Sequence, residues 1–318
     1  TRRSSDLIAF IFPGQGAQAV GMGKDLFENY DVAKKVFETA DKVLGKSVTS
    51  MCFEGPEEDL KQTVNTQPAI VTMSIAALEA FKSQLKVIPT YTAGHSLGEY
   101  CAMYCSGVMD LETTLKAIQK RADLMSQVKG GAMAAILNAP AGSLEEVLKK
   151  ASEVGYVDVA NYNSPAQVVI TGDEAAVAKA GELLMEAGAR RVVPLAVSGA
   201  FHSKFLENAG KEFASFVADL DISSASIPVV TNVDAAATIA ADDFKNKMPR
   251  QIYSSVHWTQ TIENMIKNGV DTFVEIGPGK VLAGLNRKIN SDVKTFNVYD
   301  KESLEATVNA LKEEMAAV

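Results

Sequence analysis

The chain has 318 residues, 47% hydrophobic and 22% charged, which is typical of a soluble globular protein. Its formal net charge of −8 argues against a general affinity for nucleic acid or anionic membranes. No apolar run approaches the ~18 residues of a membrane-spanning helix, and residues 1–5 have no apolar signal core, so they suggest an expression remnant or the stub of a removed leader.

Cysteine usage favours a reducing compartment, because three cysteines cannot form a disulfide framework. Cys101 and Cys105 lie four residues apart in an apolar segment, so a helix would place them on one face. No histidine or cysteine nearby completes a metal set, which favours two small core residues over ligands.

The first part of the chain predicts alternating strands and helices. Residues 7–12 read as a short buried strand, and residues 31–44 have the apolar spacing of a helix. Pro68 is predicted to open a buried helix that extends to about residue 81. Residues 87–93 resemble a strand that leads directly into Gly94-His95-Ser96-Leu97-Gly98.

The middle of the chain predicts a separate unit with the order βαββαβ, the split unit of a ferredoxin-like subdomain. The expected strands and helices are 132–137, 143–152, 156–160, 167–171, 174–187 and 191–197. We therefore expect a small inserted subdomain over residues 130–197 within a large domain of residues 1–129 and 198–318.

The last part of the chain returns to alternation. Strands are expected at 228–232 and 272–276, helices at 262–267 and 281–288, and a final strand and helix from residue 295 onwards. Strands that alternate with helices predict an α/β fold with a mainly parallel sheet covered on both faces.

Residues 94–98 (GHSLG) form a G-x-S-x-G pattern between a strand and a helical run. Such a turn exposes the oxygen of Ser96 and directs backbone N–H groups to the same point, at the start of a helix that favours negative charge. Five residues also match by chance, and a plain turn would explain them. The strand–turn–helix context favours a nucleophile at Ser96.

A serine nucleophile needs a base, and the sequence has three histidines. His95 is adjacent to the serine, so its side chain should point elsewhere. His257 precedes a helix, where a packed or surface role is the simpler interpretation. His202, in a loop of small residues after a predicted strand, is the best candidate for the base.

Arg121 falls inside the apolar stripe of a helix predicted over residues 111–128 and is its only charge. A charge that faces a core must be paired or functional. One interpretation is a structural salt bridge, or a side chain whose aliphatic part is buried while its guanidinium reaches solvent. The other is a guanidinium fork that binds a substrate carboxylate through two parallel hydrogen bonds.

Residues 12–18 (FPGQGAQ) form a glycine-rich loop at a strand end. The loop lacks both the Gly-Lys-Ser/Thr of a phosphate-binding Walker loop and the spacing of a dinucleotide site. The sequence of this loop is more consistent with a role in bringing backbone N–H groups beside Ser96 than with phosphate binding.

These segments together resemble the malonyl-CoA:acyl carrier protein transacylase family over nearly the whole chain. The matching motifs are residues 12–18, 67–69 (QPA), 94–100 (GHSLGEY), Arg121, 199–203 (GAFHS) and 275–279 (EIGPG). Several motifs in the right order are more specific than any one of them, and none of these positions departs from the family pattern.

The resemblance implies a fold and a role for each matching residue. It implies a large α/β-hydrolase-like domain with the small inserted ferredoxin-like subdomain. Ser96 would be the nucleophile and His202 the general base, oriented by the backbone carbonyl of Gln251 rather than by an aspartate. The amides of Gln15 and Leu97 would form the oxyanion hole. The implied substrate-binding residues are Arg121, which would bind the malonyl carboxylate, together with Met125, His95, Asn161, Phe201 and Ser198.

The implied reaction moves a malonyl group from malonyl-CoA to the phosphopantetheine thiol of an acyl carrier protein, in two steps through a serine ester, for fatty acid or polyketide synthesis. It implies no metal or redox cofactor, no nucleic acid or membrane partner, a monomer, and the bacterial cytoplasm rather than a plastid. Because carriers are typically acidic, docking needs a basic patch. Its candidates are Arg190, Arg191, Lys204, Lys280, Arg287 and Lys288.

Two other functions remain open from the residues alone. A serine esterase or thioesterase would share the serine and histidine, but it would want an apolar tunnel where Arg121 stands. A non-catalytic carrier-binding protein would keep the fold and would bind carrier without a covalent intermediate.

Overall fold

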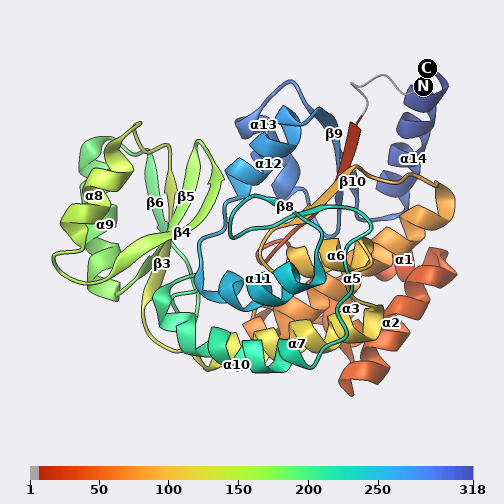
Figure 1. Cartoon of the computed structure of the whole chain (residues 1–318), viewed down its shortest axis with the longest axis horizontal. Helices are drawn as coiled ribbons and strands as arrows, with labels where there is room; N and C mark the ends of the chain where they lie inside the picture. The colour runs from red at the N-terminus through yellow and green to blue at the C-terminus, as the bar shows by residue number, and fades with distance from the viewer. Residues whose placement is uncertain (1–6, 318) are drawn as a thin grey trace.

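The computed structural model describes residues 7–317 and separates the chain into a large and a small part (Figure 1). Residues 1–5, read above as a remnant or leader stub, lie outside this range. The strands are β1 (Leu7–Phe12), β2 (Tyr91–Gly94), β3 (Ala132–Leu137), β4 (Val157–Ser164), β5 (Gln167–Gly172), β6 (Arg191–Pro194), β7 (Val229–Val230), β8 (Ala237–Thr238), β9 (Val270–Ile276) and β10 (Lys294–Val298).

Helices surround these strands. They are α1 (Lys24–Asn29), α2 (Asp31–Leu44), α3 (Val48–Glu54), α4 (Glu57–Leu60), α5 (Thr63–Gln84), α6 (Gly98–Cys105), α7 (Leu111–Gln127), α8 (Ser143–Ala151), α9 (Glu174–Ala187), η1 (Lys204–Leu206), α10 (Glu207–Ala218), α11 (Ala241–Tyr253), α12 (Trp258–Lys267), α13 (Val281–Ile289) and α14 (Lys301–Ala316). Within residues 7–317, no helix has both the length and the apolar character needed to cross a membrane.

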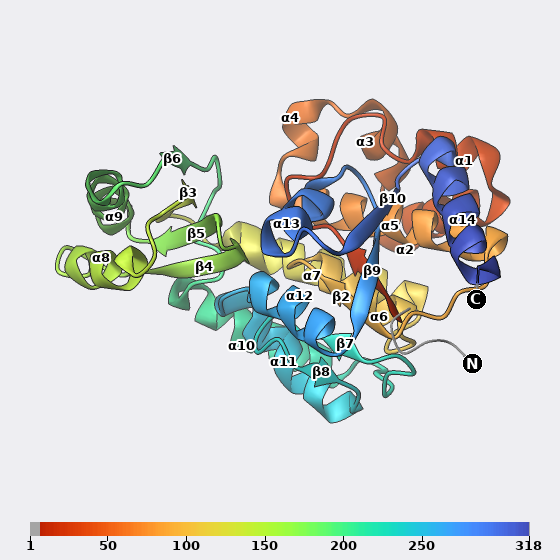
Figure 2. The same ribbon diagram turned by 90° about the horizontal axis from the view of Figure 1, so that it is seen from above.

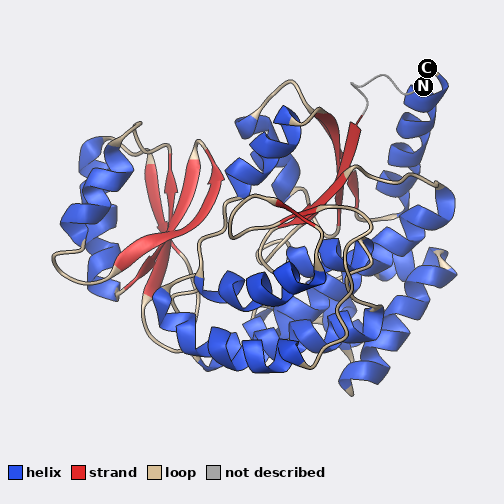
Figure 3. Cartoon of the chain, in the orientation of Figure 1, coloured by secondary structure: helices blue, strands red, loops and turns tan. Residues whose placement is uncertain are grey.

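Two sheets organise the molecule, as Figure 3 shows. The larger has the order β10-β9-β1-β2-β7-β8, and its neighbours are parallel except β7 and β8. The smaller has the order β4-β5-β3-β6 and is antiparallel. The predicted α/β class, with a mainly parallel sheet and a βαββαβ unit, is confirmed.

The large sheet is buried on both faces, which explains the continuous apolar sequence of β1. Ile8, Phe10 and Phe12 point into a core shared with helices such as α2, α5 and α7. Ala9 and Ile11 point to the opposite side, where they pack with residues of α12 and α13. Because both faces are covered, the reactive groups of such a sheet are expected beyond the carboxyl ends of its strands.

The small sheet packs helices α8 and α9 on one face and turns the other toward the large part (Figures 1 and 2). Ala134 and Ile136 of β3 share a core with these two helices. Met133 and Ala135, on the alternate face, belong to the main core. The limits at residues 130 and 197 stay a prediction.

Several predicted boundaries are wrong, most clearly at the helix that Pro68 was expected to open. This helix, α5, begins at Thr63, so Pro68 lies inside it. Proline has no N–H for the carbonyl four residues earlier. Here that carbonyl, of Val64, accepts a hydrogen bond from Nε2 of Gln119 at 3.2 Å, so tertiary structure satisfies the group that proline leaves free.

Strand lengths also differ from the prediction. β2 begins at Tyr91 rather than at residue 87, and β6 ends at Pro194 rather than at residue 197. β4 extends to Ser164 rather than ending at residue 160, so Asn161 and Asn163 lie in a strand. Strand ends depend on which partner is available, and the sequence pattern does not specify the partner.

Candidate active site

Ser96 lies at a sharp turn between β2 and α6, in the context predicted for the motif. Its φ angle is 51°, in the left-handed region, which costs a residue with a side chain about 1–2 kcal/mol. The flanking glycines permit the turn, since a Cβ atom on Gly94 would lie 2.0 Å from the Gly98 carbonyl and one on Gly98 would lie 2.3 Å from the Phe12 carbonyl oxygen. Strand, helix and loop 12–18 therefore meet at the serine.

His202 is the histidine that the fold brings to Ser96. Its Nε2 lies 2.9 Å from Ser96 Oγ. Its Nδ1–H faces two carbonyl oxygens, those of Gln251 at 3.0 Å and Ser254 at 3.1 Å. Two acceptors at Nδ1 require the proton there, which leaves Nε2 free to accept the serine proton.

The orienting groups of His202 are backbone carbonyls at the end of α11. Gln251 is the residue named from the sequence, and Ser254 is an additional one. A helix carboxyl terminus carries partial negative charge, which stabilises an imidazolium. No side-chain signal could have revealed Ser254, because it acts through its backbone.

The electrostatic setting keeps His202 neutral in the free protein. Burial, reinforced by the positive charge of Arg121, lowers the pKa of His202 to about 3. The residue is 6% exposed. A neutral imidazole at neutral pH is the form that can accept a proton.

Arg121 projects from α7 to the same point. Its Nη2 donates to Ser96 Oγ at 3.0 Å, and its Nη1 donates to Gln67 Oε1 at 2.7 Å. Arg121 is 1% exposed, and its Nε has no hydrogen-bond partner among the described residues. None of the ion pairs within residues 7–317 includes it. A structural salt bridge therefore does not account for this buried charge.

Met125 and His95 are two further residues that were predicted to bind the substrate. Gln67, which accepts from Arg121, also lies 3.5 Å from Met125 Sδ through its Nε2, so Met125 contacts the residue that holds the arginine. His95 points away from Ser96, as expected, and its Nε2 is 2.7 Å from Oδ1 of Asn163 in β4. His95 therefore joins the two parts of the molecule beside the serine.

The remaining predicted residues differ in their placement. Phe201 is buried, and its carbonyl accepts from Thr171 Oγ1 of the small sheet at 2.9 Å. Asn161 lies in β4, where its backbone pairs with Val256, and Asn163 is the asparagine that contacts His95. Ser198 is exposed, and no hydrogen bond within residues 7–317 joins it to Ser96 or His202. Its binding role stays a prediction.

The loop of residues 12–18 lies against the turn, as the sequence suggested. A Cβ atom on Gly14 would lie only 2.5 Å from the His95 carbonyl oxygen. Gln15 follows directly and is exposed. Leu97 immediately precedes α6, whose amino terminus favours negative charge. The backbone amides of Gln15 and Leu97 thus belong to segments that meet at Ser96.

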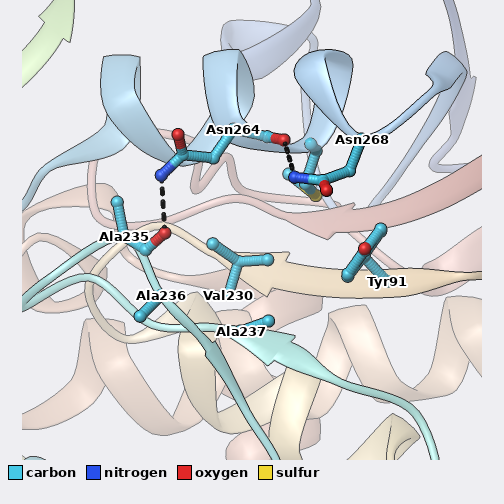
Figure 4. A pocket seen from close by; sticks show the side chains of 8 residues that line it. Tyr91, Val230, Ala235, Ala236, Ala237, Asn264 and Asn268 are labelled. Atoms are coloured by element: carbon cyan, nitrogen blue, oxygen red, sulfur yellow. Dashed lines mark hydrogen bonds between the residues drawn. The ribbon is translucent and has the colours of Figure 1, made fainter.

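Two cavities lie outside this constellation. One of about 230 Å³ is lined by Tyr91, Val230, residues 235–237 and α12 (Figure 4). Another of about 630 Å³ runs along α8 and β4. Neither lining includes Ser96, His202 or Arg121. Among the described residues no cluster of His, Cys, Asp or Glu is arranged to hold a metal ion.

An α/β fold that presents a histidine-bonded serine at a strand-to-helix turn defines the class of serine-dependent acyl-transfer proteins. The model of the acyl transferase domain matches residues 9–311. The chain belongs to this family, and within it to the malonyl-CoA:acyl carrier protein transacylases.

The relatives cover nearly the whole chain. The malonyl CoA-acyl carrier protein transacylase of Bacillus subtilis is 44% identical over 311 residues, 96% of this chain and 98% of the relative. The crystal structure of an acyl carrier protein S-malonyltransferase from Vibrio cholerae has a TM-score of 0.91 at 41% identity, covering 94% of this chain and 99% of that one. A malonyl-transacylase in complex with a type II polyketide synthase acyl carrier protein has a TM-score of 0.93 at 35% identity, covering 96% and 100%.

Proposed function

We propose that the chain transfers a malonyl group from malonyl-CoA to the phosphopantetheine thiol of an acyl carrier protein through a malonyl ester on Ser96. The observation that carries this proposal is the position of Arg121, whose Nη2 lies 3.0 Å from Ser96 Oγ. In a malonyl thioester one methylene separates the reacting carbonyl from the carboxylate. A group that binds the carboxylate must therefore stand beside the nucleophile, as Arg121 does.

In the first step, Ser96 Oγ attacks the thioester carbonyl while His202 Nε2 takes the serine proton. The tetrahedral oxyanion would accept hydrogen bonds from the N–H groups of Gln15 and Leu97, each worth about 10²–10³-fold in rate. The carbon–sulfur bond then breaks, and coenzyme A leaves with the proton from His202. General base catalysis contributes about 10²–10⁴-fold.

In the second step, the carrier thiol gives its proton to His202 and attacks the serine ester. The ester bond breaks, and Ser96 Oγ recovers a proton from the imidazolium. The sequence of steps is ping-pong, because coenzyme A leaves before the carrier reacts. The reaction needs no metal or redox cofactor, because a thioester is already activated.

The relative in complex with an acyl carrier protein supports a carrier as the acceptor. The malonyl carrier would supply fatty acid or polyketide synthesis. A monomeric state and a bacterial cytoplasmic location stay predictions.

Intact-protein mass spectrometry after brief mixing with malonyl-CoA tests the proposal, with Ser96→Ala as the matched variant. We expect a malonyl adduct on the wild type, none on Ser96→Ala, and discharge of the adduct by the carrier. An adduct that only water removes would indicate a hydrolase. Malonyl-CoA left intact by the wild type would contradict the proposal and favour a binding protein.

A further inference from the structure

Asn232 lies directly behind the serine turn, in the connection between β7 and β8. It is fully buried, and it has no counterpart among the residues singled out from the sequence. Its side chain reaches both sides of the turn. Nδ2 donates to the Gly94 carbonyl at 2.8 Å, and Oδ1 accepts from the Ser96 N–H at 2.8 Å.

Gln251 completes the contact from the other side of Ser96. Its Nε2 donates to the Ser96 carbonyl at 2.9 Å and to Asn232 Oδ1 at 3.2 Å. The backbone N–H and the backbone C=O of the serine are thus both hydrogen-bonded by side chains. These two groups are the ones that reorient when φ or ψ changes. Together, Asn232 and Gln251 oppose the return of Ser96 from its φ of 51° to an ordinary conformation.

Asn232 is itself held from several directions. Its N–H donates to Glu99 Oε1 of α6 at 2.7 Å, and its carbonyl accepts from His257 at 3.0 Å. The turn that follows is fixed by an ion pair of 2.8 Å between Asp234 and Lys247. Asn264 of α12 also holds this turn, because its Nδ2 donates to the Ala235 carbonyl at 2.8 Å, as Figure 4 shows. The asparagine is therefore presented to the serine by an anchored turn.

We propose that Asn232, together with the side chain of Gln251, is a positioning residue that holds Ser96 in its left-handed conformation and so places Oγ on His202. Because the Ser96 N–H is engaged by Asn232, it is not available to the oxyanion, which leaves the next amide, that of Leu97, for that purpose. Gln251 also orients His202 through its backbone carbonyl at 3.0 Å. Gln251 thereby sets the positions of both Ser96 and His202.

The test uses Asn232→Ala in the full chain, with Asn286→Ala as the matched control. Asn286 is also a fully buried asparagine, but it lies on α13 and donates to Thr295 Oγ1 at 3.2 Å. Two reagents are compared in single-turnover experiments. Malonyl-CoA tests the step that rests on the proposed function. A fluorophosphonate tests the serine alone, since Oγ displaces fluoride from phosphorus and passes its proton to His202.

We expect the rate constant of serine modification by either reagent to fall about 10–100-fold in Asn232→Ala, the scale of a misplacement of about 1 Å. The malonyl-CoA concentration at half-maximal rate should stay within about threefold, because Arg121 is untouched. Asn286→Ala should retain the wild-type rate constant. A merely structural role of Asn232 would lower the fraction of protein that reacts and leave the rate constant unchanged, and this result would overturn the proposal.

A second variant covers the case in which Asn232→Ala does not fold. Gln251→Met removes the donor to Ser96 at similar volume and keeps the backbone carbonyl that accepts from His202. A wild-type rate constant in this variant would refute the positioning role. Wild-type protein that reacts with the fluorophosphonate and not with malonyl-CoA would refute the proposed function, while the fluorophosphonate rates would still decide the role of Asn232.

Discussion

Replacing Arg121 with methionine should remove selectivity for malonyl over acetyl groups. Nη1 is occupied by Gln67, so the free edge of the guanidinium consists of Nε, which has no partner, and Nη2, which faces Ser96 Oγ. These two nitrogens form one fork, suited to two parallel hydrogen bonds with a carboxylate. Methionine fills a similar volume and offers no donor.

The size of the effect follows from those two bonds. Hydrogen bonds to charged groups contribute about 1.5–3 kcal/mol each, so two contribute about 3–6 kcal/mol. In the free protein Nη2 already donates to Ser96 Oγ, and it gives up this bond when it binds the carboxylate. The loss of that bond lowers the net binding free energy by about 1 kcal/mol. A net of about 2–5 kcal/mol corresponds to a loss of roughly 30- to 4,000-fold in kcat/KM for malonyl-CoA.

The assay compares kcat/KM for malonyl-CoA and acetyl-CoA in wild type, Arg121→Met and Arg121→Lys. Acetyl-CoA lacks the carboxylate, so its value should change far less than that of malonyl-CoA. Arg121→Lys keeps the positive charge without the fork, so its kcat/KM for malonyl-CoA should lie between those of the wild type and Arg121→Met. An unchanged ratio between the two substrates in Arg121→Met would refute the assignment of Arg121 to the carboxylate.

The remaining predictions concern pH and the carrier. Because the pKa of His202 in the free protein is about 3, kcat/KM for malonyl-CoA should not decline as the pH falls through 6.5. The imidazole becomes protonated, and the rate falls, only near pH 3, so a pH–rate profile with a midpoint near 6.5 would contradict this environment. Charge reversal at the exposed Arg287 should raise KM for the carrier and not for malonyl-CoA, whereas Lys116→Glu on α7, which reverses an exposed lysine paired with Glu112, should change neither. Equal effects of the Arg287 reversal on both substrates, measured by steady-state kinetics, would remove α13 from the docking surface.

Much of the fold was predictable because its signals are local. The continuous apolar run of β1 and the apolar spacing of α2 and α7 depend on residues within one element, and these elements match their predicted bounds to within a residue. Pro68 misled the prediction for α5, because a proline is tolerated inside a helix when a distant side chain satisfies the freed carbonyl. Helix α11 was not predicted, and it too contains a proline, Pro249.

The candidate site likewise contains some residues that the sequence marks and others that it does not. Ser96, His202 and Arg121 were predictable because a motif, a scarcity of histidines and a misplaced charge each mark one of them in the sequence. Asn232 and Ser254 have no such mark. One acts through contacts with residues more than a hundred positions away, and the other through its backbone carbonyl. Such contacts become visible only when the chain is folded.

The juxtaposition of Arg121 and His202 bears on how the proposed reaction discriminates between substrates. The positive charge of Arg121 contributes to the low pKa of His202, after burial. A histidine with so low a pKa is a weak base. A malonyl carboxylate on Arg121 would offset that charge, so binding the substrate would raise the basicity of the histidine that must take the serine proton. An acetyl group brings no such charge. Arg121 would therefore favour malonyl groups twice, once by binding the carboxylate and once by making His202 a better base only when that carboxylate is present.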